Sequence, residues 1–84
     1  MKILATKFDE AEVRKAYPID DRVPGWFFRC REQSNNVWRA EGTDLWGRTV
    51  GATDSDDVRV LNQCIRMAED INTQIAAAKA RNSN

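Results

Sequence analysis

The C-terminal third of the chain carries the pattern that most restricts how it can fold. Small or apolar side chains recur there at alternating steps of three and four positions: Leu61, Cys64, Ala68, Ile71, Ile75 and Ala78. This spacing predicts an amphipathic α-helix of roughly six turns. The preceding residues 54–57 (Asp-Ser-Asp-Asp) supply capping side chains and place negative charge at the positive end of the helix dipole. Such a helix needs a second layer to cover its apolar stripe.

Residues 26–53 supply that layer as a predicted three-stranded sheet. From Trp26 onward the period is two, so side chains 26, 28 and 30 point to one face and side chains 27, 29 and 31 to the other. The alternation resumes over residues 37–41 and again over residues 48–53, after turns predicted at 34–36 and 42–47. Alternating runs joined by short turns are typical of an antiparallel meander.

The N-terminal region predicts a short helix. Asp9 is followed three residues later by Glu12, which is the spacing of a capping box, and Pro18 ends the helical pattern. Residues 18–25 contain both prolines of the chain and predict a linker. Before the helix, the apolar segment from Ile3 to Ala5 is a candidate for a short edge strand, and the sequence leaves open whether it forms one.

Together these elements predict an α+β fold: a three-stranded antiparallel meander, a short N-terminal helix, and a long C-terminal helix packed on one sheet face. Residues 1–80 are expected to form a single small domain and residues 81–84 a frayed tail. The expected core joins sheet residues Trp26, Phe28, Trp38, Ala40 and Val50 to helix residues Leu61, Cys64, Ile65, Ala68 and Ile71.

Composition and charge exclude several classes of function. The 84 residues include 13 Lys and Arg, 13 Asp and Glu and no His, so bulk charge attracts neither nucleic acid nor a membrane. Without His, neither a Ser-His-Asp triad nor a Cys-His pair can form within one chain. We therefore expect a protein that is not an enzyme and has no catalytic residue, cofactor or metal site. The absence of any apolar run of signal-peptide or membrane-span length predicts a cytoplasmic protein without a membrane partner.

Three local patterns have structural interpretations. Residues 42–49 (GTDLWGRT) are one substitution from a phosphate-binding loop, but an alternating run follows instead of a helix, which predicts an ordinary turn. The aspartates of residues 54–57 are interpreted as helix caps rather than metal ligands. Cys30 and Cys64 lie 34 positions apart and fit no metal-binding spacing, so we expect two reduced, inward-facing thiols.

The sheet face opposite the long helix holds the candidate binding residues. Its predicted members are Phe27, Arg29, Arg31 and Arg39, and the candidate set also includes Trp46 in the second turn and Arg48 at the start of the third strand. Arginines with an exposed aromatic side chain suit phosphate, nucleic acid or an acidic protein surface. The simpler interpretation is a solvated face on which the arginines pair with Glu32 or Glu41. The sequence leaves both interpretations open.

Two classes of function follow from these patterns. The first is a non-catalytic interaction module that binds another protein through the arginine-bearing face or associates with itself as a homo-oligomer. The alternative is a DNA-binding domain whose sheet presents Arg29, Arg31 and Arg39. The order of one helix, three strands and a long helix is similar to that of double-stranded-RNA-binding domains, although acidic residues 54–57 stand where those domains place a basic cluster. Sheet-reading DNA modules such as integrase arm-binding domains are similar in their three-strand-plus-helix plan, which implies binding through the same arginines.

Overall fold

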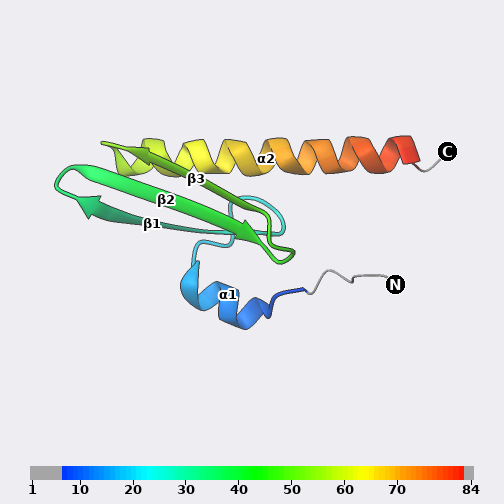
Figure 1. The fold of residues 1–84 in the computed structure, drawn as a ribbon, viewed down its shortest axis with the longest axis horizontal. Helices are drawn as coiled ribbons and strands as arrows, with labels where there is room; N and C mark the ends of the chain where they lie inside the picture. Colours follow the sequence, from blue (N-terminus) through cyan, green and yellow to red (C-terminus); the bar gives the residue numbers. More distant parts are fainter. Residues whose placement is uncertain (1–6, 83–84) are drawn as a thin grey trace.

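The computed structural model describes residues 7–82, which form two helices and one sheet. The elements are, in chain order, α1 (Glu10–Ala16), β1 (Trp26–Ser34), β2 (Val37–Asp44), β3 (Thr49–Asp54) and α2 (Asp57–Asn82). The strands are antiparallel and lie in the order β1-β2-β3. Figure 1 shows α2 along one side of the sheet and α1 on the other. The predicted α+β meander is confirmed, and the candidate strand at Ile3–Ala5 lies outside the described residues.

The core lies between α2 and the sheet. Its largest fully buried side chains are Trp26 and Phe28 on β1 and Val60 and Cys64 on α2. The two aromatic rings stack with centroids 6.4 Å apart, and the Trp26 indole N–H donates to Asn72 Oδ1 at 3.0 Å. The other buried members are Val23, Ala40 and Ala68, bordered by the partly buried Ile19, Cys30, Trp38, Val50, Ala52, Leu61, Ile65 and Ile71. The expected polarity of the sheet is confirmed, because the even-numbered aromatic side chains face α2.

The most buried row of α2 begins one residue earlier than predicted. Val60 is completely buried, whereas Leu61 is only half-buried at the border of the core. Val60, Cys64 and Ala68 recur at every fourth residue, so they form one row that faces the sheet. Leu61 stands three residues before Cys64 and fits the same helical pattern, so spacing alone could not separate the two positions.

β2 extends further than the sequence predicts. The turn expected from residue 42 is wrong at its start, because Gly42, Thr43 and Asp44 belong to the strand. Gly42 lies opposite Phe28 in the register, and a Cβ at this position would lie 2.6 Å from the Phe28 ring. Glycine is required here because the aromatic ring fills the space that a side chain would take. The tight turn follows, and β3 begins at Thr49 in place of the helix that a phosphate-binding loop needs.

α1 has the predicted start, and the segment after it packs against the sheet. Asp9 caps the helix by accepting the N–H of Ala11 at 3.0 Å, and the last helical residue is Ala16. The predicted linker is only partly a linker. Ile19 forms an isolated antiparallel bridge to β1, and Val23 is buried in the core.

α2 is capped as predicted and extends past the sheet. Asp56 Oδ1 accepts the N–H groups of Val58 and Arg59 at 2.9 and 3.0 Å. The helix continues to Asn82, and its last turns project beyond the sheet (Figure 1), so the molecule measures 50 × 25 × 23 Å. Within residues 7–82, neither helix combines the length and apolar character that crossing a lipid bilayer requires.

Candidate interaction surface

Three of the predicted binding residues gather on the sheet face that α2 does not cover. The strand register places Arg29 opposite Glu41 and Arg31 opposite Arg39. Residues two apart on a strand share a face, and directly opposed Cα atoms are about 4.5 to 5.5 Å apart, so these four side chains form one cluster. We call Arg29, Arg31, Arg39 and Glu41 the arginine face. Its three guanidinium groups and one carboxylate carry a net charge of +2.

Arg29 is the most restrained arginine of this face. Its Nε and Nη2 lie 2.9 and 2.8 Å from Glu41 Oε1. Its guanidinium carbon also lies 4.3 Å from the centre of the Tyr17 ring, directly after α1. A carboxylate and an aromatic face therefore satisfy this charge within the fold. Arg29 therefore positions Glu41, and its side chain is 36% exposed, about as much as that of Arg39.

The Arg39 side chain extends from β2 over the neighbouring strand β3. Its Nη1 donates to Thr53 Oγ1 at 3.3 Å, and its Nε lies 3.6 Å from Glu41 Oε2. Gly51 makes room for this arrangement, because a Cβ there would lie 2.5 Å from Arg39 Nη2. The Arg39 side chain nevertheless remains 37% exposed. The guanidinium is thus held against the sheet while part of it still meets solvent.

Arg31 is the least satisfied charge of the arginine face. It is exposed and stands directly opposite Arg39, an arrangement of like charges that costs energy in a sheet. None of the ion pairs formed within residues 7–82 includes Arg31. Two adjacent cations therefore stand at the open end of the face, and one of them lacks a carboxylate partner in the described part of the chain.

The single carboxylate of the face is held in its charged form. The hydrogen bond from Arg29 lowers the pKa of Glu41 below its usual value, and the charges of Arg29, Arg39 and Arg31 lower it further, while partial burial acts in the opposite direction. Glu41 is therefore ionised at neutral pH. One carboxylate cannot neutralise three arginines, so the excess positive charge persists.

Phe27 is buried, which contradicts its predicted place among the exposed binding residues. The side chain is 5% exposed, and the Arg14 guanidinium lies 5.6 Å from its ring centre. Val13 of α1 is buried as well. α1 covers this end of the sheet face, so Phe27 is a packing residue. The open part of the face is the end that carries Arg31 and Arg39.

Trp46 and Arg48 do not join the arginine face. They belong to the turn after Asp44, and Asp44 is five residues, or about 16 Å of strand, from Arg39. Asp44 is buried, its Oδ1 accepts the N–H groups of both Trp46 and Arg48, and its Oδ2 pairs with Arg48 Nη1 at 2.9 Å. Arg48 therefore fixes the turn. Trp46 is 52% exposed, as predicted, with Lys7 Nζ 5.8 Å from its ring centre.

The two cysteines are protonated thiols. Both are free; Cys64 is completely buried with its Sγ 3.3 Å from the Ala40 carbonyl oxygen, and Cys30 is half-buried. Burial raises the pKa of both thiols, and the charge of Asp57 raises that of Cys30 further. In the part of the chain that the structure describes, no three Cys, Asp or Glu side chains are grouped to hold a metal ion.

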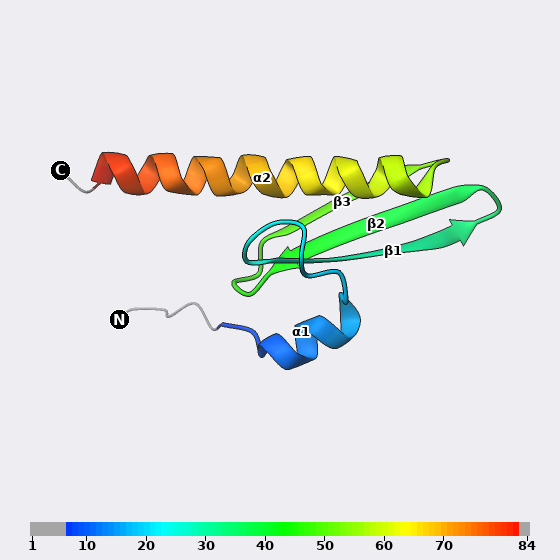
Figure 2. The ribbon, with the colours of Figure 1, turned by 180° about the vertical axis from the view of Figure 1, so that it is seen from behind.

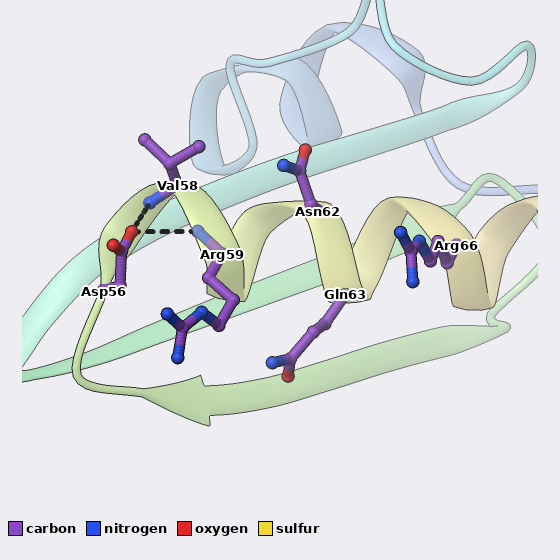
Figure 3. Close-up of a pocket in the computed structure, with 6 residues that line it drawn as sticks. All are labelled: Asp56, Val58, Arg59, Asn62, Gln63 and Arg66. Carbon is purple, nitrogen blue, oxygen red and sulfur yellow. Dashed lines mark hydrogen bonds between the residues drawn. The ribbon is translucent and has the colours of Figure 1, made fainter.

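A pocket of about 470 Å³ runs along the first turns of α2, on the opposite side of the sheet from the arginine face (Figure 3). Its lining residues are Asp56, Val58, Arg59, Asn62, Gln63 and Arg66. Asp56 is the helix cap, and Gln63 and Arg59 are directed toward Asp54 at the end of β3, at 3.0 and 3.7 Å. Most of these polar groups therefore already have structural partners, and we assign this pocket no ligand.

Spacing along the chain did not identify every residue of the site. Tyr17 reaches Arg29 only because α1 folds back over the sheet, and no local pattern encodes that contact. Gly51 and Thr53 are two residues apart on β3, so they share one face of the strand. This spacing is the sequence signal that places them on the arginine face. Comparisons of the chain with protein-family models, with curated proteins and with solved structures found no match. The geometry of the arginine face is therefore the basis for a functional proposal.

Proposed function

We propose that this chain is a non-catalytic interaction module that binds an acidic segment of another protein through the open end of the arginine face. The observation that carries the proposal is the direct opposition of Arg31 and Arg39, with Glu41 as the only carboxylate of the cluster. Opposed guanidinium groups repel each other in the absence of a partner. Two neighbouring carboxylates can satisfy both groups through charge-assisted hydrogen bonds.

The cluster is held in place before any partner arrives. Arg29 is fixed between Tyr17 and Glu41, and Arg39 is fixed between Thr53 and Glu41. Side chains that are already ordered lose little conformational freedom on binding, which favours affinity. Only Arg31 must be immobilised when the acidic segment binds.

The charge distribution favours an acidic peptide over DNA. DNA-binding surfaces neutralise several phosphates through an extended basic footprint. Here the chain has a net charge of 0, and Arg29 is already paired with Glu41. A duplex would also bring its phosphates close to the Glu41 carboxylate. A short acidic segment needs only the local pair Arg31 and Arg39.

Fluorescence anisotropy with a labelled peptide rich in Asp and Glu tests this proposal. We expect the intact chain to bind the peptide, and we expect Arg31→Gln and Arg39→Gln to weaken binding by about tenfold or more, since each removes a charged hydrogen-bond donor. Arg66→Gln is the matched control, because Arg66 is an exposed arginine on α2 and the substitution makes the same change of charge. Its affinity should stay within about twofold of the unmodified chain.

Two results would overturn the proposal. One is the absence of peptide binding at low salt, and the other is an equal loss in the Arg66→Gln control. A labelled DNA duplex provides the comparison with the alternative function. Binding to that duplex that depends on Arg31 and falls steeply between about 50 and about 200 mM salt would replace the protein-binding proposal by a DNA-binding one.

A further inference from the structure

The C-terminal part of α2 projects beyond the rest of the fold. α2 has 26 residues, which corresponds to about 39 Å of helix. Ile71 is the last apolar residue of α2 that packs against the core cluster, and Asn72 after it accepts the Trp26 indole N–H and donates to the Pro24 carbonyl oxygen. Among the described elements, α2 contacts only the three strands, and Figures 1 and 2 show its orange and red turns running past the end of the sheet. The segment of α2 after Asn72 therefore runs past the end of the sheet, and its apolar residues Ile75 and Ala78 are only half-buried.

The apolar stripe of α2 continues into this projecting segment. Ile75 and Ala78 stand four and seven residues after Ile71, so they extend the row that faces the sheet in the first half of the helix. A pocket of about 450 Å³ opens beside the stripe, with Trp46, Ile75 and Lys79 in its lining. An isolated helical segment of this length is marginal in water, and it gains most of its stability from packing of its apolar side.

The charges beside the stripe are complementary in one arrangement. Asp70 and Arg81 are exposed and lie eleven residues apart, which is close to three whole turns, so both flank the same side of the stripe. Neither forms an ion pair within residues 7–82. The midpoint between them falls between Ile75 and Ala76, in the segment that runs past the sheet. Along the helix, the apolar side chain of Ile75 therefore lies between the acidic Asp70 and the basic Arg81.

We propose that a second copy of this chain covers the stripe, with the two α2 helices antiparallel and crossing near Ile75. Such a contact is isologous, so it closes after two copies. It places Asp70 of each copy beside Arg81 of the other, and it packs Ile75 and Ala78 of both copies together. A parallel pair would instead oppose Asp70 to Asp70 and Arg81 to Arg81. The antiparallel pair also keeps the two sheets at opposite ends of the contact.

Sedimentation equilibrium of the full chain, from about 1 µM to about 1 mM, tests the dimer. We expect a monomer–dimer equilibrium in this range, and we expect Ile75→Glu to remain monomeric at every concentration because a charge would stand at the centre of the contact. Ala76→Glu is the matched control: it adds the same charge at the neighbouring exposed position and should leave the equilibrium unchanged. Ile75 lies outside the core cluster, so circular dichroism should show both variants folded.

A charge exchange tests the antiparallel arrangement. Asp70→Arg and Arg81→Asp should each weaken their own homodimer by about threefold to tenfold, because each creates two like-charge contacts. An equimolar mixture of the two variants should form a heterodimer about as tight as the original homodimer, since both contacts become attractive again.

Three results would overturn the inference: a monomer at all concentrations, equal weakening by Ala76→Glu, or no recovery in the mixture. Arg31→Gln should leave the dimer intact, because Arg31 is on the other surface. The dimer and the acidic-peptide site can therefore fail independently.

Discussion

The two faces of the sheet are built from different kinds of interaction. Under α2, the Phe28 ring occupies the space left by Gly42, and Val60 is buried without any exposed surface. On the arginine face, Arg39 and Glu41 meet at distances typical of ion pairs but remain 37% and 26% exposed. Close packing in a dry core is sensitive to single methyl groups, whereas partly solvated ion pairs contribute little each. The comparison indicates that the α2 side maintains the fold and that the arginine side is free to serve recognition.

The largest effect is expected from the core aromatic side chain. Phe28→Ala should lower the free energy of unfolding by about 3 to 5 kcal/mol, because it removes a completely buried ring opposite a glycine that cannot fill the cavity. Urea denaturation followed by far-UV circular dichroism measures this change. Trp46→Ala is the control, since that ring is 52% exposed and its loss should change stability by less than about 0.5 kcal/mol. Equal losses in the two variants would contradict the placement of the core.

Truncation of the neighbouring α2 side chains Val60 and Leu61 should lower the free energy of unfolding less than Phe28→Ala does. Val60→Ala should cost about 2 kcal/mol, from two buried methyl groups and the cavity that they leave. Leu61→Ala removes more carbon atoms but should cost only about 1 kcal/mol, because Leu61 is half-buried. Urea denaturation of both variants in the same buffer shows which substitution lowers the free energy of unfolding more. The reverse order would mean that the helix is rotated relative to the sheet.

On the arginine face, Glu41→Gln should lower the free energy of unfolding by about 0.5 to 1 kcal/mol at neutral pH. The pKa of Glu41 is lowered in the folded state, so its contribution is fully present above the unfolded pKa of about 4.3 and is lost as pH falls through the folded pKa. The free energies of unfolding of the unmodified chain and of the Glu41→Gln variant should therefore become equal at acidic pH. A gap of the same size under acidic conditions would contradict a contribution of Glu41 through its charge.

The smallest stability effect is expected at Gly51. Gly51→Ala brings a methyl group against Arg39 Nη2, and the flexible end of that side chain can move away, so stability should change by less than about 0.5 kcal/mol. Affinity for the acidic peptide should fall, though less than in Arg39→Gln, because the displaced guanidinium loses its ordered position. Anisotropy and denaturation on one sample measure both quantities. A large loss of stability with unchanged affinity would reverse the roles assigned to the two faces.

Much of the fold could be predicted because its signals are local. The three-and-four spacing of α2, the period-two run from Trp26, and the caps at Asp9 and Asp56 all appear within a few residues of the elements that they define. The end of β2 could not be predicted, because Gly42 favours a turn by its local preference. It belongs to the strand only because Phe28, distant in sequence, fills its space.

The candidate site was predicted in part for the same reason. Strand parity placed Arg29, Arg31 and Arg39 together, and this grouping is confirmed by the register. Phe27 has the same parity, yet α1 covers it, and nothing in the spacing of α1 encodes where that helix packs. Arg48 was predicted on the binding face, but a buried aspartate in its own turn holds it instead. A tertiary contact with α1 decides the position of Phe27, whereas a side-chain contact four residues away in the chain decides that of Arg48.

Nuclear magnetic resonance titration of the isotope-labelled chain with the acidic peptide tests the central proposal most directly. The expected result is a set of amide shifts confined to the strand segments 29–31, 39–41 and 51–53, with the buried row of α2 unchanged. Shifts concentrated in the 45–48 turn or along α2, or no shifts at peptide excess, would contradict recognition by the arginine face.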